Sequence, residues 1–108
     1  MANAYKVLGQ VADASANDVT LIADQNGETI VSTIVIANRE AATNTFRIAV
    51  RPGGATLANE HYLAYDATIA ANDTIALTLG VTLQTGAEIS VGASDANVTF
   101  QAYGTEIT

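Results

Sequence analysis

Hydrophobic and polar residues alternate one by one along several short stretches of this chain. The clearest is TFRIAVR at residues 45–51, where Phe46, Ile48 and Val50 point to one side of an extended strand and two arginines point to the other. A period of two residues is the signature of a half-buried β-strand. No segment keeps the three- and four-residue spacing of an amphipathic helix. The pattern therefore predicts an all-β protein with little or no helix.

The same alternation predicts further strands at residues 19–24, 29–38, 61–69, 73–80, 87–93 and 97–104, and an edge strand at residues 5–9. In the segment 29–38 it places Val31, Thr33 and Val35 on the face opposite the core. In 61–69 it places His61 and Leu63 on one face of the strand and Tyr62 and Ala64 on the other. The residues expected to face the core are Ile30, Ile34, Ile36, Ile75, Leu77, Leu79, Ile89, Val91, Val98, Phe100 and Ala102.

The segments between these strands have the composition of turns. Asn26 and Gly27 form the dipeptide that most strongly favours a tight hairpin, and the segment 52–54 fixes one φ angle with proline and frees two with glycine. Strands repeated every 8–12 residues with such turns are typical of a sandwich or barrel. We predict one antiparallel β-sandwich domain over residues 1–108, jelly-roll or immunoglobulin-like, with about eight strands. Residues 1–17 are expected to form an extended arm or an edge strand.

Composition and charge exclude several classes of protein. The chain contains no cysteine, which rules out disulfides and thiolate metal sites, and no apolar run long enough to span a membrane. Its four Lys and Arg against eleven Asp and Glu give a net charge of −7, which is unsuited to binding the phosphates of nucleic acid. The first ten residues lack the charged-then-apolar pattern of a cleaved signal. We expect a soluble protein that binds neither nucleic acid nor membrane.

The segment 47–66 holds the only proline, the only histidine, two of the four basic residues and two of the four tyrosines. A hydrolytic site at His61 would need a nucleophile and an orienting group, and no serine lies in a nucleophile-elbow motif. Arginine and tyrosine are enriched where protein interfaces concentrate their energy, and the arginines can also pair with acids across the sheet. We therefore predict no catalytic residue, and a protein–protein interface formed by Arg47, Arg51, His61, Tyr62 and Tyr65.

Two binding alternatives stay open at this stage. Asp24, Asn26 and Glu28 place oxygen atoms at alternating positions around a glycine, as in some calcium loops, although a full loop would need about a dozen residues. A plain hairpin explains the same residues, and we predict no metal ion and no cofactor. Exposed tyrosines at positions 62, 65 and 103 would also suit a carbohydrate-binding module.

Four segments carry a family resemblance that extends from about residue 20 to residue 107. They are TIVIANRE with its preceding serine (32–40), NTFRIAVRPGGATLANEHYLAYD (44–66), IAANDTIALTLGVTL (69–83) and AEISVGASDANVTFQAYG (87–104). In order and spacing they resemble a family of small all-β virion proteins of tailed bacteriophages, especially marine and cyanobacterial ones. The family commonly has a proline-alanine-glycine turn after the first strand, where this chain has ADQNGE at residues 23–28.

The resemblance implies a structural, non-enzymatic subunit of a phage particle. It favours a capsid decoration or cement protein that binds the major capsid protein or other virion proteins and assembles as a homo-oligomer such as a trimer. Such a protein is made in the host cytoplasm and lies on the outer surface of the virion. A neck, tail, baseplate or fibre component is the alternative within the same class.

Overall fold

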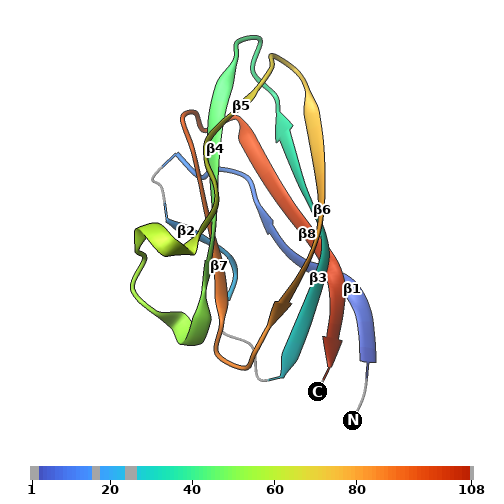
Figure 1. Ribbon diagram of the computed structural model, residues 1–108. Helices are drawn as coiled ribbons and strands as arrows, with labels where there is room; N and C mark the ends of the chain where they lie inside the picture. The colour runs from blue at the N-terminus through green and yellow to red at the C-terminus, as the bar shows by residue number, and fades with distance from the viewer. Residues whose placement is uncertain (1–2, 16–17, 24–26, 108) are drawn as a thin grey trace.

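The computed structural model describes residues 3–15, 18–23 and 27–107 (Figure 1). Within these ranges the chain forms eight strands and two short 3-10 turns, with no α-helix, which confirms the prediction of an all-β protein. The strands are β1 (Asn3–Val11), β2 (Val19–Ile22), β3 (Glu28–Asn38), β4 (Asn44–Arg51), β5 (Tyr62–Ile69), β6 (Thr74–Leu83), β7 (Glu88–Ala93) and β8 (Val98–Ile107), and the turns are η1 (Pro52–Gly54) and η2 (Asn59–His61).

The strands form two four-stranded sheets that pack face to face, with the orders β1-β8-β3-β6 and β2-β7-β4-β5 (Figure 1). All neighbouring strands are antiparallel. Strands β1 and β8, β2 and β7, β3 and β6, and β4 and β5 pair with each other, as in a long hairpin that has been rolled up. This is the order of a jelly roll, so the structure selects the first of the two predicted sandwich types.

The core lies between the sheets and is formed by the inward positions of the alternating segments. Phe100, Ile34, Ile48 and Ile89 are fully buried, and the rings of Phe46 and Phe100 meet edge to face at 6.4 Å. Complete burial of one isoleucine or phenylalanine side chain contributes about 1.5–3 kcal/mol. The predicted inward faces of β4, β7 and β8 are confirmed.

The predicted faces of β3 are wrong at its beginning. Val31 is fully buried and Ile30 is 40% exposed, the reverse of the expectation. The pairing of β3 with β6 and with β8 changes register between Val31 and Thr33, so one residue is inserted and the alternation shifts by one position. Ile34 and Ile36, after the shift, face the core as predicted.

The predicted inward position of Leu79 in β6 is also wrong, because its side chain is 42% exposed. Thr78 and Val81 of β6 pair with Thr33 and Val31 of β3. Between these pairs β6 advances by three residues and β3 by two, so β6 contains a bulge. Gly80 lies in this irregular stretch with a φ of 62°, a conformation that glycine adopts at little cost. The bulge turns Leu79 outward and returns the following residues to the core side.

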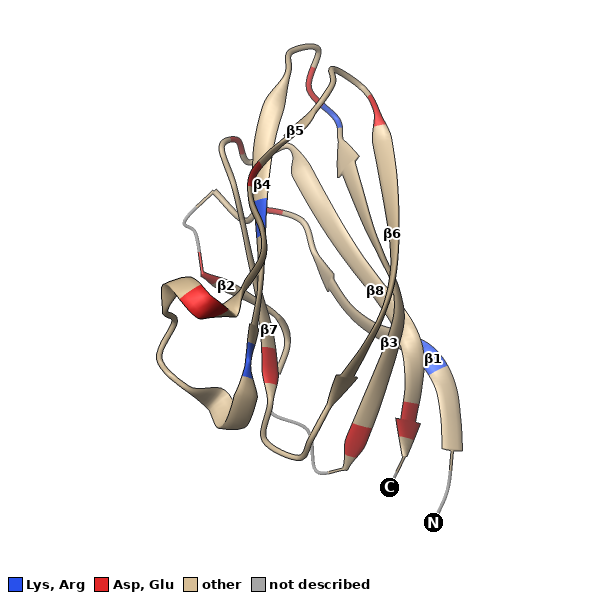
Figure 2. Ribbon diagram, viewed as in Figure 1, with Lys and Arg blue, Asp and Glu red and all other residues tan. Residues whose placement is uncertain are grey.

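The charged side chains are concentrated in a few parts of the molecule. Figure 2 marks the charged positions along the ribbon: they lie in the connecting segments, on the β2-β7-β4-β5 sheet, part-way along β1, and at the ends of β3 and β8. The middle of the β1-β8-β3-β6 sheet has none. The two outer surfaces of the sandwich are therefore chemically different.

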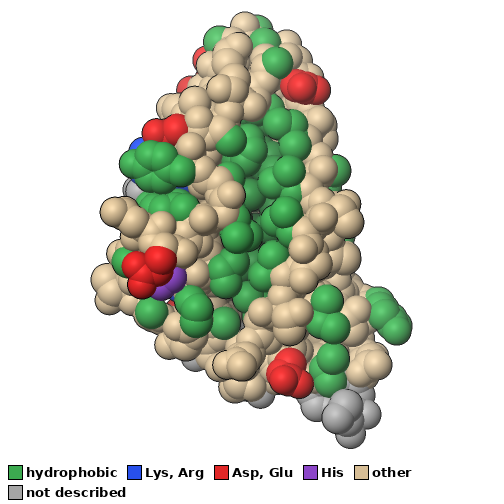
Figure 3. Space-filling model, in the orientation of Figure 1, with side chains coloured by type: hydrophobic (Ala, Val, Ile, Leu, Met, Phe, Trp, Pro, Cys, Tyr) green, Lys and Arg blue, Asp and Glu red, His purple; other side chains and the backbone are tan. Residues whose placement is uncertain are grey.

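One long side of the sandwich is open. On the side where β1 and β2 lie the two sheets approach each other, whereas on the opposite side the inward positions of β5 are the small residues Ala64 and Ala67. Ile75 and Leu77 of β6 are consequently only partly buried. Figure 3 shows apolar side chains in the hollow that runs between the sheets on this side.

Candidate interaction surface

Of the five predicted interface residues, the structure brings Arg47, Tyr62 and Tyr65 together. Arg47 projects from β4 away from the core, and its guanidinium makes two parallel hydrogen bonds to Asp66 of β5, at 2.7 Å from Nε to Oδ1 and 3.2 Å from Nη2 to Oδ2. The same guanidinium lies 4.1 Å from the centre of the Tyr65 ring. A cation over an aromatic face is attracted by the ring's quadrupole. The predicted pairing of this arginine with an acid across the sheet is confirmed.

Tyr62 and Tyr65 contact each other edge to face, with ring centres 4.9 Å apart and planes at 85°. Residues three apart on a regular strand lie on opposite faces, so β5 must be irregular here. Its pairing with β4 shifts twice between Ala67 and Tyr62, and Asp66 has a φ of 52°. The predicted grouping of Tyr62 with Ala64 is wrong for this reason, because Ala64 packs against the core while Tyr62 contacts an exposed ring.

Together these four residues form what we call the aromatic cluster: Arg47, Tyr62, Tyr65 and Asp66. Tyr65 is 58% exposed, and the neighbouring Leu63 is 50% exposed. Beside the cluster lies an open depression of about 390 Å³ lined by Thr45, Arg47, Asp66, Ala93 and Ser94. The cluster is thus an accessible aromatic surface whose arginine is already held in place.

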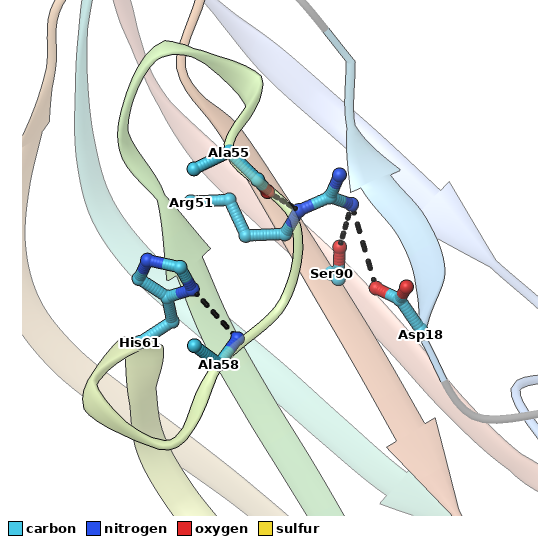
Figure 4. A network of polar contacts seen from close by, with 6 residues as sticks. All are labelled: Asp18, Arg51, Ala55, Ala58, His61 and Ser90. Carbon is cyan, nitrogen blue, oxygen red and sulfur yellow. Dashed lines mark hydrogen bonds and ion pairs between the residues drawn. The ribbon is translucent and has the colours of Figure 1, made fainter.

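Arg51 is engaged within the chain (Figure 4). Its guanidinium donates to the Ala55 carbonyl at 2.6 Å, to Ser90 Oγ at 3.0 Å and to Asp18 at 3.4 Å, and its side chain is only 16% exposed. These bonds join the segment after the η1 turn to β7 and to the residue that precedes β2. A structural role therefore accounts for this arginine, and its predicted part in an interface stays a prediction.

His61 lies in the η2 turn and not in the strand where the alternation placed it. Its Nδ1 accepts a hydrogen bond from the backbone N–H of Ala58 at 3.0 Å, which closes the turn (Figure 4). An accepting Nδ1 means that a neutral imidazole carries its proton on Nε2. In the part of the chain that the structure describes, no hydroxyl group hydrogen-bonds to this imidazole.

The alternatives from the sequence find limited support. Tyr103 lies on β8 in the other sheet, where its hydroxyl bonds Gln101, so the three tyrosines considered for sugar binding do not form one platform. Across the described ranges no three or more His, Cys, Asp or Glu residues are grouped as a metal site would require. The calcium and hairpin hypotheses depend on Asp24 and Asn26, which lie outside the described residues.

None of the described helical turns is long and apolar enough to cross a membrane.

The ion pair in the aromatic cluster changes the titration of both partners. Hydrogen bonding to Arg47 lowers the pKa of Asp66 below its usual value, and the carboxylate raises the pKa of Arg47. A carboxyl with a lower pKa in the folded state stabilises the fold above the unfolded pKa. That contribution is lost as the pH falls through the folded value.

We expect the substitution Arg47→Gln to raise the pKa of Asp66 toward its ordinary value, because it removes the neighbouring positive charge. Carbon-13 NMR of the side-chain carboxyls, followed from neutral pH to about pH 2, measures this directly. Arg51→Gln, which removes an arginine that does not contact Asp66, is the control and should leave its titration unchanged. An Asp66 pKa that is the same in wild type and Arg47→Gln would contradict the ion pair.

The fold places the chain among jelly-roll β-sandwiches. No family model and no curated protein matches the sequence. Among solved structures, a chain from the crystal structure of the T13 particle of infectious bursal disease virus matches with a TM-score of 0.55 and 10% identity. A chain from a structure of the Gx strain of the same virus matches with a TM-score of 0.50 and 13% identity.

Each match covers 96% of this chain, which spans only 30% and 31% of the viral chains. At identities this low, the similarity shows a shared fold.

Proposed function

We propose that this protein is a structural subunit of a virus particle, and that it acts by contacting other subunits. The observation that carries the proposal is the similarity of nearly the whole chain to one part of chains found in viral particles. Jelly rolls of this kind recur in viral capsid proteins. The aromatic cluster, with its exposed tyrosine, supplies a surface suited to protein contacts.

Within this class we propose a decoration protein on the outside of a tailed-phage capsid, bound to the major capsid protein. The resemblance of four segments to small phage virion proteins supports this assignment. A net charge of −7 favours solubility on an outer surface and disfavours contact with packaged DNA. A protein that binds only the assembled shell stabilises it by mass action.

The aromatic cluster is the surface that we propose for the contact with the shell. Arg47 is held by two hydrogen bonds to Asp66 and lies over the Tyr65 ring, so binding has little side-chain entropy to remove. Leu63 adds exposed apolar area at the same edge strand. Arginine and aromatic side chains of this kind are the usual energetic centres of interfaces.

Quantitative mass spectrometry of purified particles tests the virion role. We expect this chain to be present in many copies in particles of the virus that encodes it, and to remain with the capsid fraction when tails are removed. Recovery with the tail fraction would favour the neck, tail, baseplate or fibre alternative. Absence from washed particles would contradict the virion role altogether.

A binding experiment tests the surface. We expect Tyr65→Ala to weaken binding of the purified protein to capsids that lack it by about 30-fold, the effect of losing one interface hot spot. Thr20→Ala, a truncation of an exposed residue on β2 at the far side of the same sheet, is the control and should bind like wild type. Equal binding by wild type, Tyr65→Ala and Thr20→Ala would show that the protein contacts the shell through a surface other than the aromatic cluster.

A further inference from the structure

The outer face of the β1-β8-β3-β6 sheet consists of rows of side chains that cross all four strands. Tyr5, Thr105, Ile30 and Thr82 oppose one another in one row. Val7, Tyr103, Thr33 and Thr78 form the next row. Gln10, Gln101, Val35 and Ala76 form the third row. We call the surface formed by these three rows the uncharged face.

The uncharged face points away from the core. The row that contains Ala102 and Ile34 lies beside it in register, and both of those residues are fully buried. The residues of the three rows, by contrast, are exposed or partly exposed. No described element of the chain covers them, because each sheet packs on its inner side against the other.

The absence of charge on this face is unusual for this chain. The whole chain carries fifteen charged residues, four Lys and Arg and eleven Asp and Glu. Glu28 and Glu106 lie at or near strand ends, and Lys6 lies between Tyr5 and Val7 of β1 (Figure 2). Lys6 is in register with Gly104 and the buried Val31, so it points to the other side of the sheet, where it pairs with Glu106 at 3.0 Å. The face between these ends offers only hydroxyl, amide, aromatic and aliphatic groups.

The same sheet exposes most of the large apolar side chains. The described residues include six large hydrophobic side chains with substantial exposure, and four of them belong to strands of this sheet: Tyr5 at 82%, Val7 at 48%, Ile30 at 40% and Leu79 at 42%. Depletion of charge together with exposed tyrosine is the composition of an interface core. The exposure of Ile30 and Leu79 results from the bulges in β3 and β6.

We infer that the uncharged face packs against the same face of a second copy of this chain. A cationic partner would be attracted to the acidic parts of the molecule and would gain nothing from this face. Two copies with a net charge of −7 each repel one another at nearly every other surface, whereas here they can approach without apposing charges. A surface that meets its own copy across a two-fold axis needs only to match itself.

The size of the face suits a weak, reversible contact. A surface four strands wide, at about 4.8 Å per strand, and about six residues long, at about 3.3 Å per residue, covers about 400 Å². Two copies together would bury about 800 Å², the size of a transient contact. The inference does not depend on the virion role, and it gives a pair of subunits where the sequence suggested a trimer.

Sedimentation velocity of the purified chain, at about 1 to 500 µM, tests the inference over the affinities that a small interface provides. We expect a reversible dimer that becomes tighter as salt is raised, because salt screens the repulsion between the acidic copies. Thr78→Glu should weaken the dimer by about 30-fold or more, since it brings like charges into a closely packed face.

Thr68→Glu is the matched control. It makes the same replacement at an exposed threonine of β5, an edge strand like β6, but in the other sheet. We expect its dimer to be as tight as that of wild type, although its net charge is the same as that of Thr78→Glu. Tyr5→Ser, which removes an exposed ring without adding charge, is the second variant and should also weaken the dimer. It provides the test if Thr78→Glu does not fold.

Three results would overturn the inference. The wild-type chain could remain monomeric at the highest concentration in high salt. Thr78→Glu and Thr68→Glu could weaken a dimer equally, which would point to net charge alone. A dimer that survives both Thr78→Glu and Tyr5→Ser would be formed by another surface.

Discussion

Replacing Asn38 with alanine is expected to lower the free energy of unfolding by about 3 kcal/mol, because it leaves the buried amide of Asn44 and several partly buried backbone groups without this partner. Asn38 is the last residue of β3 and is 2% exposed. Its Nδ2 donates to the carbonyls of Ala42 at 2.8 Å and Ala70 at 3.0 Å. Its Oδ1 accepts from the backbone N–H of Glu40 at 3.1 Å and from Asn44 Nδ2 at 3.1 Å.

These four bonds connect the β3–β4 turn to the β5–β6 turn, so one side chain fixes two connections at the same end of the sandwich. Urea unfolding followed by circular dichroism measures the loss, and the melting temperature should fall by roughly 10–20 °C. Asn59→Ala, the same replacement at an exposed residue of η2, is the control and should stay within about 0.5 kcal/mol of wild type. If Asn38→Ala costs no more than this control, the hydrogen-bond network does not hold the two turns.

A second large effect is expected at Gly104, in the middle of β8 and between β1 and β3. A Cβ at this position would lie 2.0 Å from the backbone oxygen of Ile30 and 3.0 Å from a methyl carbon of Leu8. A backbone oxygen in a paired strand cannot move without breaking the sheet. Gly104→Ala should therefore cost about 3 kcal/mol or more, at the upper end of overpacking in a core.

Gly53→Ala separates this close contact from the general cost of replacing glycine. Gly53 has a φ of 62° in the η1 turn, and an added Cβ there would meet no atom within 4 Å. Its replacement should cost about 1–2 kcal/mol from backbone strain alone. Thermal unfolding of both variants gives the comparison, and a Gly104→Ala that is as stable as Gly53→Ala would falsify the close packing at the β3 bulge.

The aromatic cluster and the uncharged face lie on the two different sheets, and therefore on opposite outer surfaces of the sandwich. A subunit that used both could pair with a sister copy through one sheet and bind a shell through the other. The variants Tyr65→Ala and Thr78→Glu separate these roles, because each changes one surface only. Loss of shell binding in Tyr65→Ala with an intact dimer is the expected combination.

The sequence correctly predicts the fold class because alternation and turn composition are local properties. A strand with one buried face shows its period of two in five to eight residues, as in 45–51 and 97–104. The predicted inward residues there are buried, with Val50 partly buried against the core. Glycine and proline likewise mark the corner at η1, where Gly53 and Gly54 have the positive φ angles that proline and most other residues avoid. The resemblance to phage proteins adds a proposed role but no reacting group.

What only the tertiary structure decides is the relation between segments that are distant in sequence. The order of the strands, and hence the jelly roll, follows from pairings such as that of β1 with β8. The bulges that expose Ile30 and Leu79 appear only in the pairing of β3 with β6 and β8, so the sequence of a single strand does not reveal them. The same applies to the partners of Arg47 and Asn38, because a hydrogen bond depends on where two strands meet, while periodicity reports only which way each residue points.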